Sequence, residues 1–169
     1  LYRDSKERRE AVVALARHAG QPAPDLWRSQ LLIELGEYAE AETILTGLAA
    51  RAPDNPAPRA LLAQSRYESG RDAEAAPLYE AALARAAADT GSILWRQVRS
   101  AASPGERETY SHTSAEGRTD FFRVFWSHRR PDLRASLNGR VGEHFRRLRE
   151  ARNTYALQHP NSTFFHSPL

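Results

Sequence analysis

The chain has 169 residues, with 24 Lys and Arg against 21 Asp and Glu, and a formal net charge of +3 at pH 7. It contains no Cys, which excludes disulfides and thiolate metal sites, and no Met, so we expect the native start codon to lie outside it. The length is enough to bury a core, and no apolar run approaches the roughly 18 residues that a membrane-spanning helix needs.

The charge is unevenly spread along the chain. Residues 1–114 carry 14 basic and 16 acidic side chains, whereas residues 115–169 carry 10 and 5. Nearly every basic residue is Arg, whose planar guanidinium suits phosphates and carboxylates. A basic C-terminal part is therefore compatible with binding nucleic acid, anionic lipid or an acidic protein surface, and equally with a solvated helix face.

The first predicted element is a helix over residues 4–19. Asp4 or Ser5 is its expected N-cap, and Gly20 its stop signal. Its apolar stripe consists of Val12, Leu15, Ala16 and Ala19. We interpret residues 1–21 as a capping helix or as the second helix of a degenerate repeat.

One pattern is then written twice, 34 residues apart. Residues 22–52 and 56–86 agree at 12 of 31 aligned positions. A period of 34 with a central Gly and a small residue five places on resembles the tetratricopeptide repeat, a helical hairpin that stacks on its neighbours. The matching pairs include Gln30/Gln64, Glu34/Glu68, Gly36/Gly70 and Ala41/Ala75.

Each repeat is predicted to hold two antiparallel helices. In repeat one these span about residues 23–35, capped by Asp25, and about 39–51. Gly36 is expected to form the turn because a residue without Cβ lets the two helices approach. In repeat two, Gly70 takes that place, and Pro77 is expected to kink the second helix without breaking it.

The period is lost from Asp89, but the pattern stays helical. Residues 159–169 are predicted to form a non-helical tail that docks to hide Phe164 and Phe165. No stretch shows the alternation of a strand, so the predicted fold is all-α, with repeats over 22–88 and a helical domain over 89–169. Its helices are expected at 92–101, 105–110, 114–128 and 138–158, the second of them with Ser103 as its N-cap.

This second half resembles the GWxTD domain family of Gram-negative bacteria, over roughly residues 103–167. The residues that carry the resemblance are the run 121–132, FFRVFWSHRRPD, followed by Asn138, Glu143, Arg147, Ala151 and Tyr155. The chain departs from the family at Arg130 and Gly139, and it lacks the Gly-Trp-x-Thr-Asp motif. The resemblance implies an exported, periplasmic or cell-envelope protein with no assigned chemistry.

Aromatic residues and charges in this half suggest local packing. Phe122 and Trp126 share a helix face and are expected to form a buried cluster with Tyr155 or Phe145, or else an aromatic docking surface. Glu143 and Arg147 are spaced for a helical ion pair. An alternative role for Arg147 is to clamp the Arg130-Pro131-Asp132 turn through Asp132.

No catalytic motif appears in the sequence. It has no Gly-rich phosphate loop, nucleophile elbow or His-Glu-x-x-His pair, and its six His show no ligand spacing. His144 is expected to point away from any useful partner. We therefore predict a non-enzymatic protein without metal or cofactor. Nucleic-acid binding is a second hypothesis, based on Arg140, Arg146, Arg147, Arg149 and Arg152, which form no single stripe.

The leading hypothesis is a protein-interaction or scaffold module. The first helices of stacked repeats line a concave groove. The residues predicted to face it are Leu26, Gln30, Ile33 and Glu34 from repeat one, and Ala60, Gln64, Tyr67 and Glu68 from repeat two. The paired Gln and Glu would hydrogen-bond an extended peptide, unless they are simply solvated.

The alternative is a rigid wedge that docks on a larger complex. Its predicted contacts are the Arg-rich face, with Arg146 and Arg149, and the Phe164–Phe165 tail. The family resemblance suggests an accessory subunit on the periplasmic side of a membrane assembly, for example an electron-transfer complex.

Overall fold

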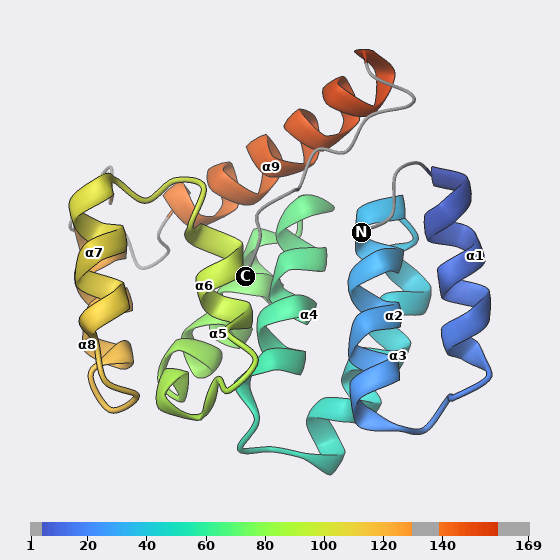
Figure 1. The fold of residues 1–169 in the computed structure, drawn as a ribbon, viewed down its shortest axis with the longest axis horizontal. Helices are drawn as coiled ribbons and strands as arrows, with labels where there is room; N and C mark the ends of the chain where they lie inside the picture. Colours follow the sequence, from blue (N-terminus) through green and yellow to red (C-terminus); the bar gives the residue numbers. More distant parts are fainter. Residues whose placement is uncertain (1–4, 130–138, 159–169) are drawn as a thin grey trace.

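The computed structural model describes residues 5–129 and 139–158, with side chains as far as residue 154 (Figure 1). Within these ranges the secondary structure is helical and contains no strand, which confirms the all-α prediction. The helices are α1 (Ser5–Ala16), α2 (Pro22–Leu35), α3 (Tyr38–Arg51), α4 (Pro56–Glu68), α5 (Asp72–Leu83), η1 (Ala86–Ala88), α6 (Ile93–Val98), α7 (Pro104–His112), α8 (Arg118–Ser127) and α9 (Gly139–Gln158).

The two repeats form the helical hairpins α2/α3 and α4/α5, which pack on each other through α3 and α4. The chain reverses at Gly36 and Gly70, whose φ angles of 79° and 80° lie in the left-handed region. A Cβ built at either glycine would meet nothing within 4 Å. The turns therefore need glycine for its backbone conformation, and the expected reason, close helix approach, is wrong.

The starts of the first helices are fixed by local hydrogen bonds. In repeat two, the Asn55 side chain accepts a bond from the Ala57 amide, 3.0 Å away, and caps α4. In repeat one, Gln21 is the N-cap, so the prediction of Asp25 as cap is wrong. Asp25 lies inside the first turn of α2, where its buried carboxylate accepts a bond from the Gly20 amide at 3.0 Å.

The array continues beyond the second repeat. Helix α6 packs on α4, as α4 packs on α2, and so extends the row of first helices where the sequence period had been lost. The Asp89 carboxylate holds the start of α6 by accepting bonds from the amides of Ile93 and Leu94, at 3.0 and 2.8 Å. Helix α5 runs unbroken through Pro77, as expected.

Figure 1 shows α1 at one edge of the molecule, α7 and α8 at the other, and α9 running across the ends of α4 and α6. Helix α7 begins with the predicted Ser103 cap, which forms a full capping box with Glu106. Helix α8 begins later than expected, at Arg118, because Ser114 opens a turn before it.

One hydrophobic cluster runs through the repeats and the C-terminal helices. The ring of Phe145 in α9 stacks on Tyr67 of α4, with centroids 5.5 Å apart, and meets Tyr79 of α5 edge-on at 5.6 Å. Tyr79 in turn meets Trp126 of α8 at 6.1 Å. Phe145 and Trp126 thus belong to one buried cluster, as predicted, joined through Tyr79, and this cluster fixes α9 and α8 against repeat two.

Candidate protein-interaction surface

The polar residues of repeat two are hydrogen-bonded inside the molecule. Gln64 donates from Nε2 to Glu68 Oε1 at 2.8 Å, and Gln97 of α6 donates to Gln64 Oε1 at 2.9 Å. The hydroxyl of Tyr38 donates to Glu68 Oε2 at 3.3 Å. The Glu68 side chain is fully buried, with 0% exposed.

This burial contradicts the predicted location of four residues. Ala60, Gln64, Tyr67 and Glu68 were expected on the surface of a groove, and all four are buried. Helices α6 and α9 pack on α4 and cover them. The first helix of repeat two consequently offers no free polar side chain at these positions.

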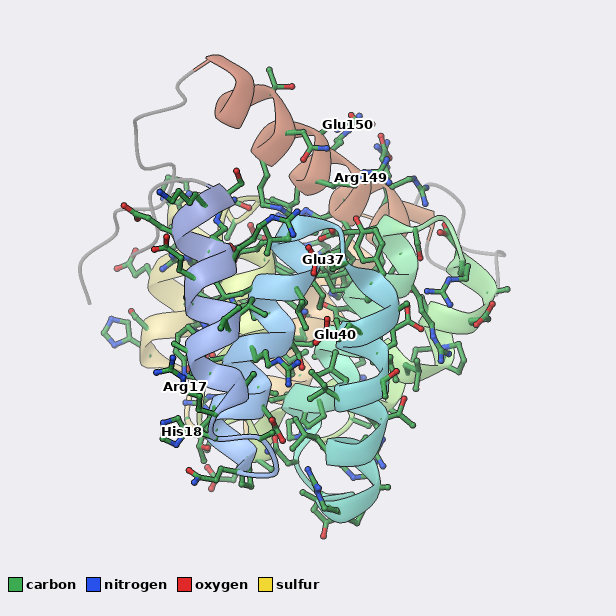
Figure 2. All side chains as sticks on the ribbon, turned by 90° about the vertical axis from the view of Figure 1, so that its right-hand side faces the viewer. Arg17, His18, Glu37, Glu40, Arg149 and Glu150 are labelled. Atoms are coloured by element: carbon green, nitrogen blue, oxygen red, sulfur yellow. The ribbon has the colours of Figure 1, made fainter. Side chains whose placement is uncertain are left out.

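Helix α9 brings three arginines to repeat two. Arg152 pairs with Glu68 at 2.5 Å, and Arg146 pairs with Asp72 at 2.7 Å. Arg149, labelled on α9 in Figure 2, donates to the Glu68 carbonyl at the last residue of α4. Cations are favourable at a helix C-terminus, where unpaired carbonyls concentrate negative charge. The basic helix is therefore bound to the end of α4.

The same contact brings the backbone of α9 close to the Asp72 side chain. A Cβ added at Gly142 of α9 would come within 2.4 Å of Asp72 Oδ2. That carboxylate is held by Arg146, so it is not free to swing away. A glycine at this position lets α9 approach the start of α5.

The other arginines of α9 are paired along the helix itself. Arg147 meets Glu143 at 2.5 Å, which confirms the predicted pair, and Arg140 meets the same carboxylate at 2.7 Å. Each of the five arginines on which the nucleic-acid hypothesis depended thus has an acidic or carbonyl partner. Arg146 and Arg149, predicted as outward contacts, face repeat two.

Repeat one is more open. Leu26, Gln30 and Glu34 are half-buried, but Ile33 is only 1% exposed and belongs to the core, so its predicted surface location is wrong. Glu34 faces Arg8 of α1 at 3.5 Å. Burial raises the pKa of Glu34, and Arg8 opposes that rise.

Trp27 is a surface feature that the sequence analysis missed. Its ring is 50% exposed, and the guanidinium of Arg96 in α6 lies over it, 5.2 Å from the ring centroid. This cation–π contact joins the first helix of repeat one to α6. The sequence did offer a signal for this feature, because Trp27 is a large apolar side chain directly next to the predicted groove residue Leu26.

His144 also differs from its prediction. Its Nε2 lies 2.7 Å from the Gln97 carbonyl, and since a carbonyl only accepts, Nε2 carries the hydrogen. The ring packs against Trp126 and Phe145. Burial lowers the pKa of His144, so it is neutral and links α9 to α6 as a structural donor.

A pocket of about 310 Å³ lies between α5 and α8, next to the start of α9. Its apolar wall includes Leu83 of α5 and Val141 of α9, and exposed Glu80 and Arg123 stand among its lining residues. Such a volume is at the lower end of the range for ligand sites, about 300–1,000 Å³. The remaining lining residues are Tyr67, Ala76, Tyr79, Ala84, Thr119, Phe122, Trp126 and Ser127.

Comparison with known proteins identifies the repeats. Residues 9–65 match the model of the tetratricopeptide repeat family. The match supports a tetratricopeptide-type helical array over this stretch. The match covers most of α1, the α2/α3 hairpin and most of α4. No curated protein and no solved structure gives a significant match to the chain.

Tetratricopeptide repeats generally mediate protein–protein interactions and are typically non-catalytic. In the part of the chain that the structure describes, no group of three or more His, Cys, Asp or Glu could hold a metal ion. The described helices include none that is long and apolar enough to cross a bilayer. Asp132, Asn138, Phe164, Phe165 and the side chain of Tyr155 lie outside the described residues.

Proposed function

We propose that this protein is a non-catalytic docking module whose partner polypeptide binds the outside of the folded body and does not enter the groove of repeat two. The observation that carries this proposal is the internal pairing of Gln64 and Glu68 with Gln97 and Arg152. A peptide would have to displace α9 and leave the buried Arg152 without its carboxylate. Breaking a buried ion pair in this way costs about 3–5 kcal/mol.

The pocket between α5 and α8 supplies the anchor point. Its walls are mainly apolar, and its volume suits one or two large side chains better than a cofactor. In protein interfaces, a few anchor residues in such pockets provide most of the binding energy. We therefore propose a partner segment with an apolar anchor residue, flanked by charges that complement Glu80 and Arg123 at the pocket.

A location in the cell envelope is part of the same proposal. It is supported only by the resemblance of residues 103–167 to the GWxTD family, and it makes the protein an accessory subunit on the periplasmic side of a larger membrane assembly, such as an electron-transfer complex. Fractionation of the native cell tests it. Recovery of the protein with the cytoplasmic fraction would refute this location without affecting the pocket.

The pocket can be tested by blocking it. Ala84 lines the pocket and is exposed, so Ala84→Phe should fill the opening without disturbing the core. Ala87 is an exposed alanine three residues along the chain that does not line it, and Ala87→Phe is the matched control. We would place a photo-reactive amino acid at position 127, where the exposed Ser127 lines the pocket, crosslink the full chain in native cells and identify the product by mass spectrometry.

Loss of one defined crosslink in Ala84→Phe and its retention in Ala87→Phe is the expected result. Trp27→Ala provides the competing measurement, because this exposed ring lies on the first helix of repeat one, next to the predicted groove residue Leu26. If Trp27→Ala abolishes the crosslink and Ala84→Phe preserves it, the partner uses the repeat groove and the proposed docking mode is wrong.

A further inference from the structure

The outer face of α1 carries no described neighbour. Helix α1 forms one edge of the array in Figure 1, and Figure 2 turns that edge toward the viewer. The inner side of the helix packs on α2 through buried Ala11. On the outer side, Val13 is 62% exposed and Ala14 is exposed beside it, which makes Val13 the most exposed large hydrophobic residue of the described chain.

Two opposite charges stand at the ends of this apolar pair. Glu10 lies one turn before Val13 and Ala14, and Arg17, the first residue after α1, lies about one turn after them on the same side. A shallow hollow is lined, among the described residues, by Arg9, Glu10, Val13, Ala14 and Arg17. The long charged side chains thus surround the apolar side chains of Val13 and Ala14.

Among the described residues, ion pairs form at two neighbouring arginines of α1 but at neither of these end charges. Arg8 pairs with Glu34, and Arg9 pairs with Glu37. Glu10 and Arg17 make no ion pair with any residue in the described ranges. They stand seven residues apart, about 10 Å along the helix, which is too far for them to pair with each other.

We propose that this face binds the same face of a second copy of the chain, with the two α1 helices antiparallel about a two-fold axis. From Glu10 to Arg17 this face presents an acid, an apolar pair and a base. When a second copy lies against it in the opposite direction, each acid meets a base and the apolar pairs meet each other. Antiparallel pairing sets Glu10 of each copy against Arg17 of the other and stacks Val13 on the partner's Ala14. A parallel arrangement would place like charges together.

Two-fold symmetric dimers are the commonest assemblies of identical chains, and their interfaces must be self-complementary in this way. One helix face buries less than the roughly 1,200–2,000 Å² of a standard stable interface. The dimer is therefore a weak one that forms with rising protein concentration. It leaves the pocket between α5 and α8 free, at the other side of the array, so it does not depend on the proposed function.

Exchanging the charges at positions 10 and 17, which face each other across the two-fold axis, provides the test. Sedimentation equilibrium of the full chain should show reversible dimerisation. Glu10→Arg and Arg17→Glu each create two like-charge contacts per dimer, and each should weaken self-association about tenfold or more. The double variant Glu10→Arg/Arg17→Glu restores both contacts with the signs exchanged, and should dimerise as the unaltered chain does.

Mixing the two single variants gives the decisive measurement. The Glu10→Arg chain and the Arg17→Glu chain complement each other at both ends, so the mixture should form heterodimers although neither variant self-associates. A monomeric unaltered chain, single variants that dimerise normally, or a mixture that stays monomeric would each overturn the proposal. Because both positions are exposed, circular dichroism should show unchanged helix content in every variant.

Discussion

The two repeats carry the same Gln and Glu at the same positions but place them in different surroundings. In repeat one, Gln30 and Glu34 are half-buried, and Glu34 meets Arg8 at 3.5 Å. In repeat two, Glu68 has no exposed surface and is bound by Arg152 and Gln64. The repeated sequence thus determines the hairpin, while the neighbouring elements determine whether its polar residues are free to bind a partner.

The charge asymmetry of the chain has the same explanation. The repeat-bearing part is slightly acidic and the C-terminal part is basic. In the structure, part of this difference is used within the molecule, where Arg146 and Arg152 of α9 pair with Asp72 and Glu68 of repeat two. A charge pattern that suggested an external anionic partner thus reflects, in part, contacts inside the molecule.

The largest expected effect comes from neutralising the two matched glutamates separately. Glu68→Gln removes the carboxylate that the nearly buried guanidinium of Arg152 contacts directly, and should lower the free energy of unfolding by about 3–5 kcal/mol. Glu34→Gln removes a partly exposed pair and should change it by less than about 1 kcal/mol. Urea unfolding of both variants at neutral pH measures the difference.

A double variant shows whether the loss comes from the unpaired charge. Glu68→Gln/Arg152→Gln removes both charges, and should recover part of the stability lost in Glu68→Gln. Equal losses at Glu34 and Glu68 would mean that the two repeats do not differ as the structure indicates.

The sequence predicted what depends on nearby residues. The hairpins, the turns at Gly36 and Gly70, the Ser103 cap and the Glu143–Arg147 pair were all visible as spacings along the chain. Each depends either on contacts within a few residues or on a repeat that becomes visible when the chain is aligned with itself. The all-α fold class followed from these local patterns.

The covering of repeat two could not be predicted in the same way. It depends on pairs such as Gln64 with Gln97, 33 residues apart, and Glu68 with Arg152, 84 residues apart. A repeat assigns Gln64 and Glu68 to the concave face, but no spacing indicates which later helix will lie on them. For the same reason the inward direction of His144 was missed.

The close approach of α9 to α5 allows a second test of how repeat two is covered. Gly142→Ala should destabilise the chain by about 1 kcal/mol, because the new Cβ forces the Asp72 carboxylate away from Arg146 and this outweighs the better helix propensity of alanine. In an Asp72→Ala background the obstacle is gone, and the same substitution should stabilise by about 0.5–1 kcal/mol. Thermal unfolding of the four chains measures the reversal. The same sign in both backgrounds would show that α9 does not approach α5 at Gly142.

The smallest expected effect is the pH dependence of Glu34, the open member of the matched pair. Burial raises its pKa above the ordinary value of 4.5, so the folded chain holds this proton more tightly than the unfolded chain does. The stability that this provides is fully present below the unfolded pKa and is lost as the pH rises through the folded pKa.

The Glu34→Gln variant lacks this titrating group. The unfolding free energy of the unaltered chain, relative to this variant, should therefore fall between about pH 4 and pH 7, by less than about 1 kcal/mol. Urea midpoints at the two pH values give this difference directly, with the other titrating groups cancelling. A rise over the same interval would mean that the charges of Arg8 and Arg152 outweigh burial, so that Glu34 behaves as an ion-paired carboxylate.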